Sequence, residues 1–237
     1  MARRRRSGLI SLVVVVVIGA LLATGVYIAD GYVRDRVQDR VAAKLQQTLA
    51  TPGLPTVQIT GSPFLTQVAT RDVRHVHVVA DQIGGTSENA LPVAHADLEI
   101  SDVTTTDWFE SMTAGHIEGT ALVAYDVLQS LAKSPIEYGG DGRLKLSVTT
   151  AVLDVDVHAV ITGTPRLEQA SQSITLADPK ISVAGVDLPD FTAQALLRAV
   201  LKPIPITGLP TGILVSSVSA DTDGLHAEVT GDDVPLQ

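Results

Sequence analysis

The chain has 237 residues, 45% of them hydrophobic, and a formal net charge of −9 at pH 7. Four of its 17 basic residues are Arg3 to Arg6, so the remaining chain sets 13 basic against 26 acidic residues, a balance that repels nucleic-acid phosphates. The absence of cysteine excludes disulfides and thiolate metal sites. Aromatic residues, at 3%, are too few for a sugar-stacking face or a base-stacking platform.

The N-terminus has the pattern of a membrane anchor. No charged side chain occurs between Ser7 and Ala29, and these 23 residues reach about 34 Å as a helix, enough for a hydrocarbon core of roughly 30 Å. The preceding arginines place the N-terminus in the cytoplasm. The expected organisation is a basic N-terminus at 1–8, a transmembrane signal-anchor at 9–29 and an extracytoplasmic domain at 30–237.

A cleaved signal peptide is the alternative for this segment. It shares the basic start, and Ala23, Thr24 and Gly25 offer small residues for a peptidase. The protein would then be secreted. Under both interpretations the C-terminal part is exported.

A helix is predicted to continue from the membrane over residues 32–50. Its apolar residues recur every four positions and charged residues lie between them, which gives one apolar stripe. The stop signal is Thr51-Pro52-Gly53. The stripe consists of Val33, Val37, Val41, Leu45 and Leu49.

After Pro55 the hydrophobic period changes from four to two, which is typical of half-buried strands. Each predicted strand has one apolar and one polar face. The first strand is broken by Gly61-Ser62-Pro63. The predicted strands contain Val57 and Ile59, then residues 75–80, 94–100, 153–158 and 225–230.

The segment from Arg143 to Ile161 shows a change of register. Its apolar residues are even-numbered at Leu144 and odd-numbered by Leu153. We interpret this as one long strand with a β-bulge near residues 149–152, as a strongly curved sheet would need.

Two further helices and a closing hairpin complete the pattern. One helix covers Tyr125 to Ala132, and another begins with Asp190 as N-cap and ends before Pro203. The hairpin pairs Ile213–Ala220 with Gly224–Thr230. The predicted fold class is therefore α+β and β-rich, in one exported domain.

No motif in the chain points to catalysis. There is no nucleophile elbow, P-loop or dinucleotide fingerprint. Two groups of polar residues recur at strand spacing, and we assign them to solvent-facing strand faces rather than to a metal. They are His75 and His77, and Asp154, Asp156 and His158. We predict no catalytic residue, no metal ligand, no cofactor and no enzymatic activity.

Scarce aromatic residues occur near two predicted loops. Phe64-Leu65 follows the Gly-Ser-Pro break, and Trp108-Phe109 lies in a polar stretch. Each pair can fold back into the core, or form an apolar lip that touches lipid, because aromatic side chains favour the membrane interface. We list Phe64, Leu65, Trp108 and Phe109 as candidate lipid-binding residues.

Three blocks of sequence resemble the LmeA-like phospholipid-binding proteins of mycobacterial-type cell envelopes. They are Val57-x-Ile59-x-Gly61 through Gln67, Leu98 through Val103, and Ile206 through Ile213 with Asp223-Gly224-Leu225. The likeness covers about residues 34–236. One departure is Ser62, where the family often has a bulkier apolar residue.

The resemblance implies a tubular fold, in which a long curved antiparallel sheet wraps around helices and an apolar channel. It implies binding of anionic phospholipid such as phosphatidylinositol, and a role in maintaining envelope lipoglycans. We therefore expect a membrane-anchored protein that binds or shuttles phospholipid. The alternative is a non-enzymatic envelope scaffold with a solid core that binds a protein partner.

Overall fold

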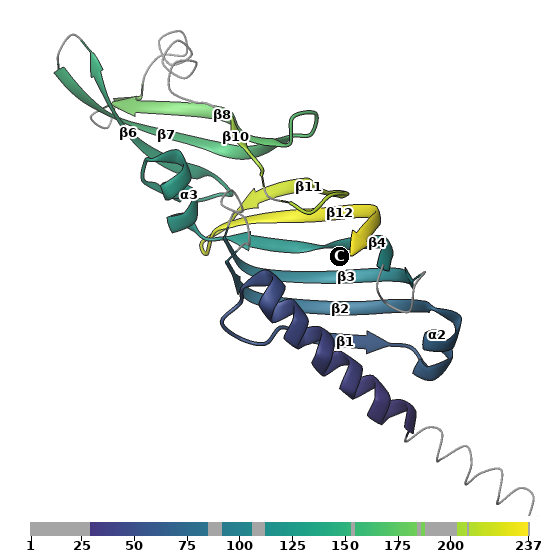
Figure 1. The fold of residues 1–237 in the computed structure, drawn as a ribbon. Coiled ribbons are helices and arrows are strands. Elements are labelled where there is room, and N and C mark those ends of the chain that lie inside the picture. The colour runs from purple at the N-terminus through teal and green to yellow at the C-terminus, as the bar shows by residue number, and fades with distance from the viewer. Residues whose placement is uncertain are drawn as a thin grey trace, which may run out of the picture.

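The computed structural model describes residues 29–84, 92–105, 112–152, 155–183, 186–187, 203–207 and 209–236. Over these ranges the fold is a β-rich α+β arrangement of two curled antiparallel sheets and three helices (Figure 1). The predicted fold class is confirmed at this level.

Sheet A carries six strands, all paired antiparallel. Their order is β1 (Thr56–Thr60), β2 (Asp72–Ile83), β3 (Val93–Thr105), β4 (Met112–Val123), β12 (Leu225–Leu236) and β11 (Ile213–Ala220). Strand β4, rich in glycine and weak in alternation, was not predicted from the sequence. Strand β12 continues past the predicted end at Thr230 and pairs with β4 as far as Leu236↔Met112.

Sheet B is smaller and is built around one long hairpin. Its order is β10 (Ile204–Pro205), β8 (Ser173–Val183), β7 (Val155–Glu168), β6 (Leu144–Val152) and β5 (Ile136–Tyr138), with β9 (Val186–Asp187) paired to β8. Sheets A and B meet where β11 contacts β7.

The hairpin of β6 and β7 corrects one prediction. The chain does not run through 143–161 as a single bulged strand, because Val152 pairs with Val155 and Leu146 with Ile161. A reversal over two residues pairs each even-numbered residue with an odd-numbered one. The apolar face therefore changes parity at the turn without any bulge.

Three helices lie against the sheets. The first covers residues 29–49 and runs across sheet A, and its apolar stripe packs on β1, β2 and β3 (Figure 1). The second, α2 (Phe64–Thr70), was not predicted. The third, α3 (Tyr125–Ala132), has the predicted bounds and packs by Leu128 against sheet B.

Two predicted segments cannot be compared with the fold. The anchor up to Ile28 and the helix at 190–201 lie outside the described residues. Among the helices that the structure describes, none is both long and apolar enough to cross a membrane.

Candidate lipid-binding site

The inner face of sheet A, which helix 29–49 covers, is lined by aliphatic side chains. Alternation along the strands puts Val57, Ile59 and Val78 on this face, where they are buried together with Ala42 of the helix. Around this centre the apolar side chains are only partly buried. These are Val33, Val37, Val41, Leu45, Val68, Val76, Leu98, Ile100, Met112 and Leu236.

A second apolar cluster joins the end of sheet A to sheet B. Val123 of β4 and Leu225 of β12 pack there with Leu128 of α3. The sheet B members include Ile161 and Ile181, which are 1% and 2% exposed. The faces that the helices cover are thus aliphatic along both sheets, and such surfaces suit acyl chains, which gain about 0.8 kcal/mol per buried methylene.

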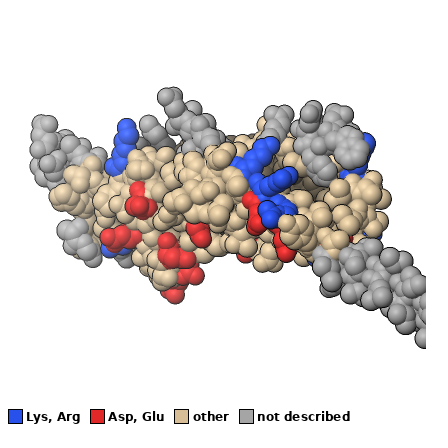
Figure 2. Space-filling view, turned by 60° about the horizontal axis from the view of Figure 1, so that its bottom comes forward, with Lys and Arg blue, Asp and Glu red and all other residues tan. Residues whose placement is uncertain are grey.

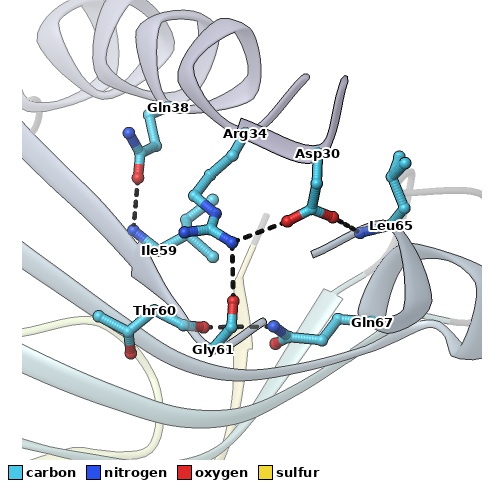
Figure 3. Close-up of polar contacts among 8 residues, drawn as sticks. All are labelled: Asp30, Arg34, Gln38, Ile59, Thr60, Gly61, Leu65 and Gln67. Carbon is cyan, nitrogen blue, oxygen red and sulfur yellow. Dashed lines mark hydrogen bonds and ion pairs between the residues drawn. The ribbon is translucent and has the colours of Figure 1, made fainter. Parts of the chain in front are cut away.

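A polar network, which we call the helix latch, holds helix 29–49 on the edge of sheet A (Figure 3). Asp30, although 2% exposed, accepts the backbone N–H of Leu65 at 2.7 Å. It thereby caps α2, whose own N-cap residue, Pro63, offers no side-chain acceptor. The N–H groups of Leu65 and Phe64, helped by Arg34, hold the pKa of Asp30 below its usual value, against partial desolvation.

The helix contributes two more members to the latch. Arg34 donates to Asp30 at 3.0 Å and to the carbonyl of Gly61 at 2.9 Å, and its guanidinium lies 5.9 Å from the ring centroid of Phe64. Gln38 accepts the backbone N–H of Ile59 at 2.8 Å, which satisfies a donor on the edge strand β1 (Figure 3).

Gln67 completes the latch from the side of α2. Its amide donates to the carbonyl of Thr60 at 3.3 Å and accepts from the backbone N–H of Arg74 at 3.0 Å, so it joins β1 to β2. Gly61 has a φ of +98°, and a Cβ there would lie 2.6 Å from the amide nitrogen of Gln67. Only glycine fits this position.

The outer face of sheet A carries histidines paired with carboxylates. Three pairs bridge neighbouring strands at 2.7 Å and a fourth closes the turn before β12 at 2.9 Å. The pairs are His77 with Asp97, His95 with Asp81, His116 with Asp232, and His226 with Asp223. The hydrogen bond that His116 donates to the Asp232 carboxylate raises the pKa of His116 above its usual value.

These histidines do not assemble a metal site among the residues that the structure describes, where no three His, Cys, Asp or Glu side chains come together for an ion. His75 contacts the hydroxyl of Ser101 at 3.3 Å, and His158 contacts that of Thr149 at 3.0 Å. Asp154 lies outside the described residues. The absence of a bound metal stays a prediction.

A family model described as LmeA-like phospholipid-binding matches residues 28–230. The chain belongs to this family. No curated protein matches the chain, and no solved structure does. In this LmeA-like chain, the matched region includes the helix latch, all of sheet B, and sheet A as far as Thr230 of β12.

In the LmeA-like domain, the two residues of the first candidate pair, Phe64 and Leu65, differ in how far they are buried. Phe64 is 1% exposed and belongs to the buried cluster under helix 29–49, so its ring lies in the core rather than in an exposed lip. Leu65 is 36% exposed. The expected loop is the first turn of α2, because Asp30 supplies the cap from a distant part of the chain.

The second candidate pair, Trp108 and Phe109, lies outside the described residues, in the connection between β3 and β4. Its assignment stays a prediction. Lipid contact by Phe64 and Leu65 likewise stays a prediction.

Sequence reasoning missed the latch residues of the LmeA-like domain. One signal was present: Asp30 is the first charged residue after the uncharged run, and Arg34 follows at the i, i+4 spacing of a helical ion pair. Gln67 is the last residue of the first block that resembles the family, and no role was predicted for it. Its contacts depend on the meeting of β1, α2 and β2, which no local pattern encodes.

Proposed function

We propose that this LmeA-like protein is a membrane-anchored, extracytoplasmic phospholipid-binding protein without enzymatic activity, which holds acyl chains against the inner face of sheet A. It carries anionic phospholipid, such as phosphatidylinositol, in the maintenance of envelope lipids and lipoglycans. The family supports lipid binding, and the basic start followed by an uncharged run supports the anchor and the export.

The observation that carries the proposal is the partly buried apolar layer between helix 29–49 and sheet A. In this layer Val76, Leu98 and Ile100, which surround the buried centre, are aliphatic and only partly buried, which leaves surface for a ligand. Such a lining binds chains by the hydrophobic effect and discriminates little between their lengths. Headgroup selection then falls to polar residues at the rim.

The test is whether the domain co-purifies with lipid. A soluble version starting at Ala29 keeps Asp30 and therefore the latch; it is extracted with organic solvent and analysed by mass spectrometry. We expect stoichiometric phospholipid. Leu98→Gln should reduce the bound lipid, whereas Leu214→Gln, at a side chain that is 54% exposed, should not.

A lipid-free domain would contradict the proposal and favour the scaffold with a solid core.

The topology is tested separately by a reporter fused after Gln237, which should be active only outside the cytoplasm. Elemental analysis of the same protein should find no stoichiometric zinc. One equivalent that is lost in His75→Ala with His77→Ala would contradict the assignment of these histidines.

A further inference from the structure

The end of sheet A that holds α2 displays exposed side chains of the kind found at membrane interfaces. Tyr32 is 62% exposed and Leu65 is 36% exposed. The guanidinium of Arg36 lies 5.3 Å from the ring centroid of Tyr32 and donates to its hydroxyl at 3.0 Å. Tyrosine and arginine both combine an apolar body with a polar tip, which suits the boundary between headgroups and acyl chains.

The helix latch fixes α2 to the start of helix 29–49. Asp30 binds Leu65, and Arg34 binds both Asp30 and Gly61 (Figure 3). The first turn of α2 is therefore held beside residues 30–34 of the helix. The position of this part of the helix therefore determines the position of α2.

The start of helix 29–49 directly follows the predicted membrane span. The span is predicted to end at Ala29, and the chain is helical from Ala29, the first residue that the structure describes, so the domain follows the predicted span directly. Tyr32, three residues further, is only about 5 Å along a helix from the end of the span. The α2 end is consequently the part of the domain nearest to the bilayer.

The outer face of sheet A has the opposite character. Among the described strands of this sheet, Arg74 is the only lysine or arginine. Figure 2 shows lysine and arginine side chains near the middle of the face drawn, with carboxylates beside them and a larger group of carboxylates to the left. Anionic headgroups repel the carboxylates of the outer face, so the domain is not expected to lie flat on it. These carboxylates are Asp81, Asp97, Glu99, Glu118, Glu228 and Asp232.

We propose that the domain docks upright on an anionic phospholipid bilayer by its α2 end, with Tyr32 and Leu65 in the headgroup layer. Sheet B lies at the opposite end of the molecule from α2 and then points away from the membrane (Figure 1). This inference rests on the membrane anchor of the proposed function. It adds the orientation that the latch imposes.

The chain contains no cysteine, so single nitroxide labels report depth without background. The full chain is reconstituted into vesicles of phosphatidylcholine and phosphatidylglycerol with a label at Leu65→Cys. A second α2 label at the exposed Thr66→Cys and a control at Val186→Cys, which is 67% exposed on β9, complete the set. The latch survives the Leu65 change because only the backbone N–H of Leu65 takes part.

We expect relaxation by oxygen and by a water-soluble nickel complex to place both α2 labels in the headgroup layer and the Val186 label in water. Water-exposed α2 labels on a chain that floats with the vesicles would overturn the orientation and leave the anchor intact. A bilayer-embedded Val186 label would overturn it too. A chain that does not float would contradict the anchor itself, and the orientation with it.

Discussion

The two faces of sheet A are built by alternate residues of the same strands, yet they contribute differently to the stability of the domain. On β4, Ile117 points inward and is 2% exposed, while the adjacent His116 and Glu118 point outward. The inner face loses water on folding, so each methylene there contributes to stability. The outer face remains hydrated, so its ion pairs contribute little.

The difference teaches that the number of polar contacts is a poor guide to where this domain is stable. The outer face has the short distances between histidine and carboxylate atoms. Burial of the inner face nevertheless contributes more to the free energy of unfolding. Changes on the inner face should therefore alter stability strongly at every pH. Changes on the outer face should be small and should depend on pH.

The largest effect is expected for Phe64, at the junction of the helix, α2 and the inner face. Phe64→Ala removes a ring that is 1% exposed and should cost about 3–5 kcal/mol in the free energy of unfolding, measured in urea. Leu65→Ala is the matched control, since its side chain is 36% exposed and should cost within about 0.5 kcal/mol. Equal costs would mean that Phe64 is not in the core.

A smaller effect is expected from a single methyl group on the inner face. Ile117→Val should cost about 0.5–1.5 kcal/mol. Its neighbour Glu118 lies opposite Glu99 on the outer face and also pairs with His116 at 3.8 Å, so the two effects of Glu118→Gln oppose each other and should change the free energy of unfolding by less than about 0.5 kcal/mol. If Glu118→Gln proved the more damaging change in urea unfolding, the contrast between the faces would fail.

Asp30 tests the latch that joins the helix to this sheet. Asp30→Asn should lower the urea midpoint modestly at pH 7, because an amide oxygen still accepts the Leu65 N–H but no longer attracts Arg34. The pKa of Asp30 is lowered by folding, so its contribution is present above the unfolded value of 3.8 and is lost as pH falls through the folded value. Variant and wild type should converge in acid.

The matched control for this change is Asp35→Asn, an exposed aspartate on the same helix. It should leave the urea midpoint unchanged at both pH values. A similar loss in both variants would assign the effect to helix charge rather than to the latch.

The outer face should respond to pH in the opposite sense. The pKa of His116 is raised by Asp232, so its stabilisation is fully present below the unfolded value of 6.5 and is lost as pH rises through the folded value. His116→Gln should lower the thermal midpoint at pH 5.5 more than at pH 8.

The smallest change in stability is expected for Trp108, between β3 and β4. As an exposed lip, Trp108→Ala should cost within about 0.5 kcal/mol, yet vesicle co-sedimentation should fall because the indole no longer inserts at the interface. A loss of about 3–5 kcal/mol would instead place Trp108 in the core. Unchanged vesicle binding would remove it from the lipid site.

Periodicity in the sequence was enough to predict the regular helices and strands of the fold. The stripe from Val33 to Leu49 predicted the first helix, and strict alternation in residues 94–100 and 225–230 predicted half-buried strands. These patterns are local because burial of one face repeats with the period of the element itself. The three resembling blocks predicted the family because their residues, order and spacing can be compared directly in the sequence.

Only the tertiary structure decided the register of β6 with β7, the existence of α2 and the burial of Phe64. Each depends on a partner distant in sequence or across a turn: Val155 for Val152, Asp30 for the N–H of Leu65, and helix 29–49 for the ring. An α2 of seven residues is too short to be stable alone, so its pattern carries no signal without the cap that Asp30 supplies. The sequence by itself determined which residues avoid water, whereas the packing of the helix on the sheet decided which of them are enclosed.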